Sequence, residues 1–328
     1  MSEVQRYIHA LNSVLREYMG ADPRYLYMGE DVRFATRGVA KGLVDEFGPD
    51  RVLDCPISEQ GFTGVATGLA MAGYRPIVEY QITALLYVAF DQLVDQAQKM
   101  SFITGGQTAV PVTYLMAGSG WRPGIAGQHA DNPYALLVHC GMKTGIPVAA
   151  DDAAGMLRAA LDDPDPVMLF LPAACLPSRG EISGDVAPIG TGRIARPGTD
   201  ISVCAIGPMV NLALEAAEAM ELDGVSVEVI DPRWLLPFDY DLLRQSIRKT
   251  GRLVVCDDAS RSCGIASEIA ASVHEMFPHD LRAPVERLTR PDVPMPFAPT
   301  LESAVVPNVV KLCDAIRRAL RTTEGTRR

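Results

Sequence analysis

The feature of this sequence that most restricts its fold is an alternation of short apolar runs with segments of helical periodicity. In the first half of the chain, strand-like runs lie at 25–28, 51–53, 76–80, 110–115 and 167–171. Helices are expected at 62–72 and 86–100, where apolar residues recur at helical spacing. This alternation is typical of an α/β domain with a mainly parallel sheet.

A second alternation follows a polar stretch rich in glycine and proline. We place a linker at 181–197, between a first domain at 1–180 and a smaller second domain at 198–328. In the second domain, strands are expected at 201–206, 225–230 and 253–256, and helices at 212–220, 240–249 and 265–276. The predicted architecture is therefore two α/β domains, each a mainly parallel sheet flanked by helices.

Composition excludes several classes of protein. The 328 residues are 48% hydrophobic and 21% charged, which favours buried cores over disorder. The net charge of −10 argues against a nucleic-acid partner, which requires a basic face. No apolar run is long enough to cross a membrane, and we expect neither a membrane partner nor a signal peptide.

The seven cysteines form no C-x-x-C pair, which fits a reduced, cytoplasmic protein. We expect each cysteine to be a small buried apolar residue, and His139 to be a packing residue in a helix. His274 and His279 are expected at the surface.

Common self-contained catalytic motifs are missing from the sequence. It has no phosphate-binding loop, no G-x-G-x-x-G, no G-x-S-x-G and no H-E-x-x-H. A chain of this size without such a motif suits a subunit whose site is completed by another chain.

The most informative stretch is 54–98. It contains Pro-Ile-Ser-Glu-Gln-Gly-Phe at 56–62, Gly-Leu-Ala-Met-Ala-Gly-Tyr-Arg-Pro at 68–76, Glu79, Gln81, and Ala-Phe-Asp-Gln at 89–92. These motifs resemble the β subunits of thiamine-diphosphate-dependent pyruvate and branched-chain 2-oxo acid dehydrogenases, called E1 components. Further matches at 29–32, 232–233, 237–239, 291–292 and 296–297 extend the resemblance over nearly the whole chain.

The resemblance implies a pyrimidine-type thiamine-diphosphate-binding domain and a C-terminal transketolase-like domain. It implies that the enzyme decarboxylates a 2-oxo acid and transfers the acyl group to the lipoyl arm of an acyltransferase. The family's Gly-Asp-Gly motif for the diphosphate and Mg²⁺ is missing here. Those groups would therefore be held by an α-type partner in an α2β2 heterotetramer.

Glu59 is the residue to which the resemblance assigns cofactor activation, through a hydrogen bond to N1′ of the aminopyrimidine. Gln81 and Leu85 would also bind the cofactor. From the residues alone, Glu59 follows a strand and precedes a helix, where a carboxylate can also simply interact with the helix dipole. Within that helix, Gly64, Gly68 and Ala72 fall four apart on one face. Their small size suits either a tight contact inside the domain or a subunit interface.

Two further sites follow from the resemblance. His129, in a glycine-rich loop, would lie near the substrate and assist acyl transfer. A potassium ion would be held, mainly by backbone carbonyls, at Val112, Ala160, Leu161, Asp163 and Asp165. The alternative for the last four is a plain Asp/Pro turn.

The chain departs from the family at several positions. Leu85 replaces an aromatic residue, Leu115 an arginine and Leu171 an acid, and Trp121-Arg122-Pro123 occupies a usually glycine-rich loop. These departures leave two alternatives open. One is a two-chain thiamine-diphosphate-dependent carboligase or transketolase-like enzyme, and the other is a degenerate structural subunit.

Overall fold

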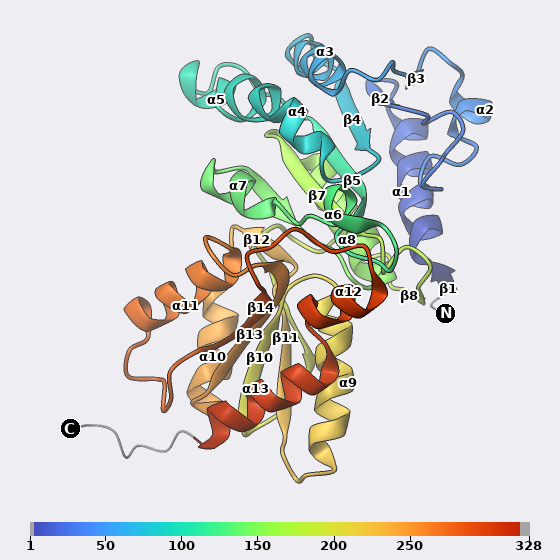
Figure 1. The fold of residues 1–328 in the computed structure, drawn as a ribbon. Coiled ribbons are helices and arrows are strands. Elements are labelled where there is room, and N and C mark those ends of the chain that lie inside the picture. The colour runs from blue at the N-terminus through green and yellow to red at the C-terminus, as the bar shows by residue number, and fades with distance from the viewer. Residues whose placement is uncertain (1–2, 322–328) are drawn as a thin grey trace. The chain divides into compact units, whose positions relative to one another are not determined.

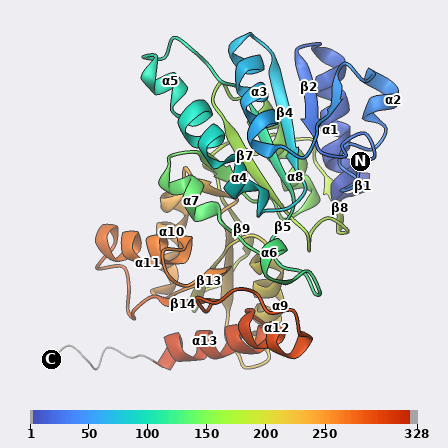
Figure 2. The ribbon, with the colours of Figure 1, turned by 45° about the horizontal axis from the view of Figure 1, so that its top comes forward.

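The structure is a computed structural model that describes residues 3–321 as two compact units (Figures 1 and 2). The first unit runs to Arg122 and continues from His129 to Ile189, and the second comprises Pro123–Gln128 and the chain from Gly190 onward. Each unit has a mainly parallel sheet with flanking helices, as predicted. The linker prediction at 181–197 overlooked two strands, because the range includes part of β8 (Arg179–Ile182) and all of β9 (Arg193–Arg196).

The first unit is built on parallel strands in the order β6-β7-β5-β4-β2-β3. Its strands are β1 (Glu3–Arg6), β2 (Tyr25–Gly29), β3 (Val52–Asp54), β4 (Arg75–Tyr80), β5 (Thr113–Ser119), β6 (Lys143–Gly145), β7 (Val167–Pro172) and β8, which pairs antiparallel with β1. Its helices are α1 (Tyr7–Ala21), α2 (Leu43–Phe47), α3 (Glu59–Met71), α4 (Leu85–Asp91), the π-helix η1 (Gln92–Gln98), α5 (Met100–Ile103), α7 (Tyr134–His139) and α8 (Ala150–Asp162). The short helix α6 (Ala126–His129) belongs to the second unit except for His129.

Helices cover both faces of this sheet. On one face α1 packs against α8, and on the other α3 packs on β4 and contacts α4 and η1 (Figure 1). Since both faces are covered, strands such as β2, β5 and β7 are buried along their whole length. That burial explains why they appear in the sequence as continuous apolar runs.

The second unit has a five-stranded sheet in the order β14-β13-β10-β11-β9, parallel except for β9. Its remaining elements are β10 (Ile201–Ala205), α9 (Met209–Glu221), β11 (Val227–Asp231), β12 (Trp234–Leu236), α10 (Tyr240–Thr250), β13 (Leu253–Ser260), α11 (Ile265–Met276), β14 (Glu286–Arg290), α12 (Pro299–Val305) and α13 (Val309–Arg321). α9 packs against α13, whereas α10 and α11 contact β10 and β13.

The strands and helices expected from the sequence are all present, with shifted ends. The helix expected at 86–100 is a succession of α4, η1 and the start of α5. The strand expected at 110–115 begins and ends later, as β5. Within the described residues, no helix is long and apolar enough to span a bilayer.

Close backbone packing in the second unit depends on Gly198, which leads into β10. A Cβ atom at this position would lie 2.2 Å from the Glu228 backbone nitrogen of β11. We expect Gly198→Ala to destabilise the protein by about 2–4 kcal/mol, because the clash involves backbone that cannot rotate away. Gly20→Ala in α1, where nothing lies within 4 Å, should instead be neutral or stabilising by up to about 1 kcal/mol. Denaturant unfolding of the two variants measures the difference, and equal stabilities would contradict this role of Gly198.

Candidate active site

Three glutamates gather at one edge of the first sheet. Glu30 directly follows β2, Glu79 lies near the end of β4, and Glu59 is the first residue of α3, after β3. In the sheet β2 lies between β3 and β4, and Gly29 is paired with both Asp54 and Glu79. The carboxyl ends of these strands therefore bring the three side chains to the same edge, where α/β proteins bind their ligands.

Glu59 and Glu30 form a pair of coupled carboxyl groups. Glu59 is only 5% exposed although it begins a helix. Burial raises the pKa of Glu30 to about 7, helped by the charge and hydrogen-bonding contact of Glu59. Glu30 can therefore keep a proton near neutral pH. Oε1 of Glu30 is buried and has no hydrogen-bond partner.

Glu79 anchors the other side of the cluster. It is 1% exposed, and it accepts hydrogen bonds from the Tyr27 hydroxyl and from Nε2 of Gln81, the latter at 3.2 Å. Burial raises the pKa of Glu79 to about 7, against the opposing effect of the Tyr27 hydrogen bond. The same Gln81 nitrogen donates to the Glu30 carbonyl at 2.9 Å. Gln81 thus links the two strand ends and is fixed in orientation.

The cluster offers hydrogen-bond acceptors to a ligand. Oε1 of Gln81 and Oε1 of Glu30 are both buried without a hydrogen-bond partner, and the Glu30 carboxyl lies beside that of Glu59. Orphaned buried acceptors are costly unless a donor meets them. An aminopyrimidine carries N–H groups that can do so, and the half-buried Leu85 at the start of α4 supplies apolar surface for a ring. The residues present therefore fit the pyrimidine end of thiamine diphosphate.

His129 is the last residue of α6, and it is exposed. Within the described part of the chain it has no hydrogen-bond partner, and its position near the substrate stays a prediction. The segment after it is tied to α4, because Tyr87 Oη donates to Asp131 Oδ2 at 3.0 Å. That bond holds the loop after His129 on the helix that begins at Leu85.

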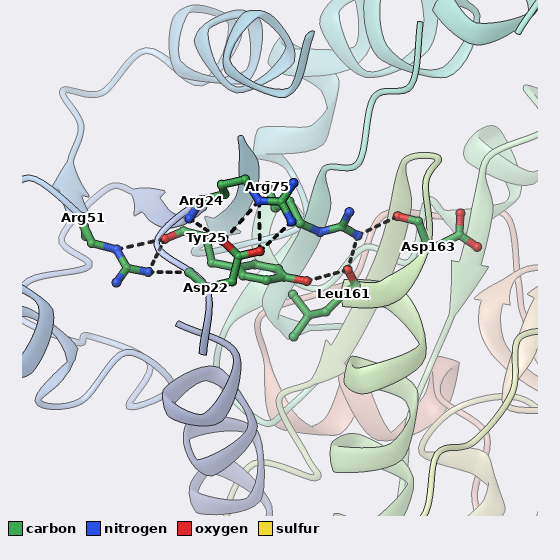
Figure 3. Close-up of polar contacts among 7 residues, drawn as sticks. All are labelled: Asp22, Arg24, Tyr25, Arg51, Arg75, Leu161 and Asp163. Atoms are coloured by element: carbon green, nitrogen blue, oxygen red, sulfur yellow. Dashed lines mark hydrogen bonds and ion pairs between the residues drawn. The ribbon is translucent and has the colours of Figure 1, made fainter. Parts of the chain in front are cut away.

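The residues predicted to hold potassium lie together, but protein donors already occupy their carbonyls. Figure 3 shows the Arg75 guanidinium reaching from β4 to the carbonyls of Leu161 and Asp163, the second at 3.1 Å. The Tyr25 hydroxyl also donates to Leu161 at 3.0 Å.

The other predicted carbonyl ligands are also engaged. The Ala160 carbonyl accepts from Thr113, and the Val112 carbonyl accepts from the backbone of Val167. The Asp163 and Asp165 side chains bind Lys143. A potassium ion would compete with a guanidinium and an ammonium for these oxygens. As they are arranged, the residues do not fit the ion, and potassium has no part in the function proposed below.

Gly64 and Gly68 on α3 differ in whether a contact inside the unit requires a small residue. A Cβ atom at Gly64 would lie 2.9 Å from Oε1 of Gln92, so this glycine serves a tight contact inside the unit. Gly68 is exposed and has nothing within 4 Å. At Gly68, therefore, no contact with residues 3–321 requires a small residue, and the subunit-interface alternative stays open.

Leu115 and Leu171 are fully buried on the neighbouring strands β5 and β7. In the register Leu115 pairs with Leu169, so Leu171 lies two residues further along the same face. Both positions are filled by apolar packing, and no charge is left unpaired by the departures from the family.

Two minor predictions need correction. His139 is exposed, because the short helix α7 buries Tyr134 and Leu137 on its other side. The expectation that every cysteine is buried is wrong for exposed Cys263 and for half-buried Cys55 and Cys140. The surface positions of His274 and His279 are confirmed.

Comparisons with known proteins agree with this geometry. The transketolase pyrimidine-binding domain family matches residues 4–178, and the transketolase C-terminal domain family matches residues 190–312. The chain is 40% identical over 319 residues to the rice (Oryza sativa subsp. japonica) mitochondrial pyruvate dehydrogenase E1 component subunit beta-2, covering 94% of this chain and 85% of the rice protein. The chain belongs to the family of E1 component β subunits.

A bacterial relative and a solved structure extend the comparison. The β subunit of acetoin:2,6-dichlorophenolindophenol oxidoreductase from Bacillus subtilis (strain 168) is 38% identical, with 95% of this chain and 96% of that protein covered. A split-gene transketolase, described as an inactive beta4 tetramer, superimposes with a TM-score of 0.79 over 97% of this chain and 99% of its own. At 23% identity, that structure shows the fold alone.

The sequence analysis gave no role to Glu30 and Glu79, although both lie in motifs that carry the family resemblance. The available signal was their position, since each is an acid at the end of an apolar strand-like run. Tyr27 had no such signal, because a tyrosine inside a buried strand is indistinguishable from a core residue.

Glu79 makes the stability of the fold depend on pH. In the folded state its pKa is about 7, above the ordinary value of 4.5. Between these values the folded carboxyl keeps a proton that the unfolded chain releases, so its contribution to stability falls as pH rises and the loss is complete above about pH 7. We expect the unfolding free energy of Glu79→Gln to decrease less between pH 5 and pH 8 than that of the wild type. A pH-independent loss of stability caused by the amide would not affect this comparison.

Denaturant unfolding at several pH values measures this slope. Glu275→Gln, which removes an exposed carboxyl on α11, is the matched control and should keep the wild-type slope. An unchanged slope in Glu79→Gln would show that this carboxyl is ionised at pH 5 in the folded protein.

Proposed function

We propose that this chain is the β subunit of a heteromeric E1 enzyme that decarboxylates a 2-oxo acid with thiamine diphosphate and passes the acyl group to a lipoyl arm. The observation that carries the proposal is the buried Glu59 carboxyl beside that of Glu30, whose carbonyl is held by Gln81, with one buried oxygen on each of Glu30 and Gln81 left without a hydrogen-bond partner. When bound, thiamine diphosphate supplies the carbon nucleophile for this chemistry.

Each residue of the cluster has a definite task in this proposal. Glu59 holds a proton at a carboxylate oxygen directed to N1′ of the aminopyrimidine. Glu30, with its pKa near 7, can keep a proton near neutral pH, so that the pair need not carry two negative charges. Gln81, fixed by Glu79 and the Glu30 carbonyl, orients the ring through its free oxygen. Leu85 packs on the ring face, and His129 meets the substrate from the loop.

The partner in this proposal is an α-type subunit that binds the diphosphate and Mg²⁺ and forms an α2β2 assembly. Support comes from an exposed apolar surface on α3 and its neighbours, which we call the α3 face. Its members are Ile57, Val65, Gly68, Met71, Val88, Phe102 and Ile103. The most exposed of these side chains is that of Phe102, at 90%. Exposed apolar side chains on elements that contact one another favour a protein interface.

A cytoplasmic location is also part of the proposal. All seven cysteines are free, which is compatible with a reducing compartment.

Replacing Glu59 tests the central assignment. We expect Glu59→Gln, assembled with the α-type subunit, to lose about 10²–10⁴-fold in kcat while thiamine diphosphate still binds, because the amide keeps hydrogen-bonding capacity but cannot hold the proton. Glu275→Gln, an exposed change on α11, is the control. Steady-state turnover and calorimetric cofactor binding give the two readouts. Full activity of Glu59→Gln would refute the assignment.

The substrate is established in the same assay by a panel of pyruvate, branched-chain 2-oxo acids and acetoin. Release of CO₂ with acyl transfer to a lipoyl domain supports the proposed reaction. Carbon–carbon bond formation without a lipoyl acceptor indicates the two-chain carboligase or transketolase-like alternative. Cofactor binding without turnover of any substrate indicates a structural subunit.

The α3 face is tested at Gly68. We expect Gly68→Leu to leave the isolated chain folded, because nothing lies within 4 Å, and to weaken association with the α-type subunit at least about tenfold by blocking close approach. Gly20→Leu on α1 is matched, since Gly20 also lies in a helix with open surroundings. Analytical ultracentrifugation measures both, and undiminished assembly of Gly68→Leu would place the partner elsewhere.

A further inference from the structure

Two arginines face each other on the small sheet of the first unit. β1 and β8 are antiparallel, and Arg6 is paired directly with Arg179. Directly opposed residues point to the same face, with Cα atoms only about 4.5–5.5 Å apart. Like charges in this arrangement destabilise a sheet. Among the described residues, neither guanidinium has a hydrogen-bond or ion-pair partner. In that part of the chain, no paired acid offsets the repulsion, although Glu181 lies two residues from Arg179 on the same face of β8.

The surroundings add further positive charge. Arg6 is also the N-cap of α1, whose first turn contains His9 and no acidic residue. The N-terminus of a helix carries partial positive charge and disfavours basic side chains. Two local preferences are therefore violated at one place, and such coincidences are expected at functional sites.

The charges border a hollow of about 610 Å³. Its polar lining residues include Arg6, His9, Asn12, Ser13, Arg16 and Arg179. Arg16 is already neutralised by Glu46 and held by Asn12, so the uncompensated charge lies at the Arg6 end. Glu181, the acid on the same strand, is opposite Val4 and does not line the hollow.

We propose that this hollow is a binding site for a phosphate-type dianion. Two guanidiniums on one face can each donate a pair of hydrogen bonds to phosphate oxygens, which a single ammonium cannot do. His9 and the Ser13 hydroxyl provide further donors. The volume lies in the range of small-molecule pockets, so the site has room for a phosphate monoester as well as for inorganic phosphate. It shares no residue with the Glu59 cluster and does not depend on the proposed function.

Binding is tested on the full-length chain and on its assembly with the α-type subunit, with inorganic phosphate and glycerol 3-phosphate as probes. Calorimetry is run against sodium chloride at equal ionic strength. We expect saturable binding that chloride does not reproduce, and at least about tenfold weaker binding in Arg6→Gln and in Arg179→Gln. Arg24→Gln, which removes another exposed arginine of the same unit, should bind as wild type. Tighter binding of the monoester than of inorganic phosphate would identify an organic phosphate as the ligand.

A second readout separates binding from folding. Without phosphate at low salt, Arg179→Gln should melt at or above the wild-type temperature, because the opposed charges are relieved, and phosphate should no longer raise it. The proposal is overturned if phosphate acts no differently from chloride, or if Arg179→Gln retains wild-type binding. It is also overturned if the isolated chain binds phosphate and the assembly does not, since the partner then covers the hollow.

Discussion

The candidate site depends on the way Glu79 is held inside the first unit. A carboxyl that is almost completely buried is costly unless it is hydrogen-bonded or protonated, and here both conditions contribute. Tyr27 on the neighbouring strand donates to one oxygen and Gln81 to the other. Because Gln81 also holds the Glu30 carbonyl, the ends of β2 and β4 are fixed to each other. The position of Glu30 beside Glu59 follows from this connection.

The coupled carboxyls explain how a site with few polar residues can handle a proton at neutral pH. An isolated surface glutamate would be ionised and unable to donate. Burial beside a second carboxylate moves Glu30 to a pKa of about 7, where both protonation states are accessible. The chain reaches this condition by placing acids at the ends of adjacent parallel strands, and it needs no metal or histidine to do so.

Much of the fold could be predicted because buried parallel strands produce uninterrupted apolar runs. Glu59 was identified through its motif, and its burial at the start of α3 supports the assignment. α8 escaped notice because it is rich in alanine and buried on most sides, so that only Asp151, Arg158 and Asp162 mark its polar face. β8 and β9 lie in a polar stretch whose glycines and prolines suggest a loop, since edge strands bury little apolar surface.

The sequence could not reveal the contacts that depend on register. The facing of Arg6 and Arg179 requires the pairing of β1 with β8, which are far apart in the chain. Arg75 likewise donates hydrogen bonds to the carbonyls of Leu161 and Asp163, which lie far from it in the sequence. The motif resemblance predicted a potassium ion at these carbonyls, whereas in the structure the positively charged guanidinium of Arg75 binds them.

Arg75, at the beginning of β4, helps to fix the position of this strand. Arg75 clamps this six-residue strand to the end of α8, while Glu79 and Gln81 secure its far end. A strand tethered at both ends cannot slide to accommodate a larger or smaller acyl chain. Under the proposed function, we expect substrate preference to depend on the segments that follow β4 and β5, namely the turn at Leu85 and the loop around Trp121. At both places the sequence predicts a departure from the family pattern.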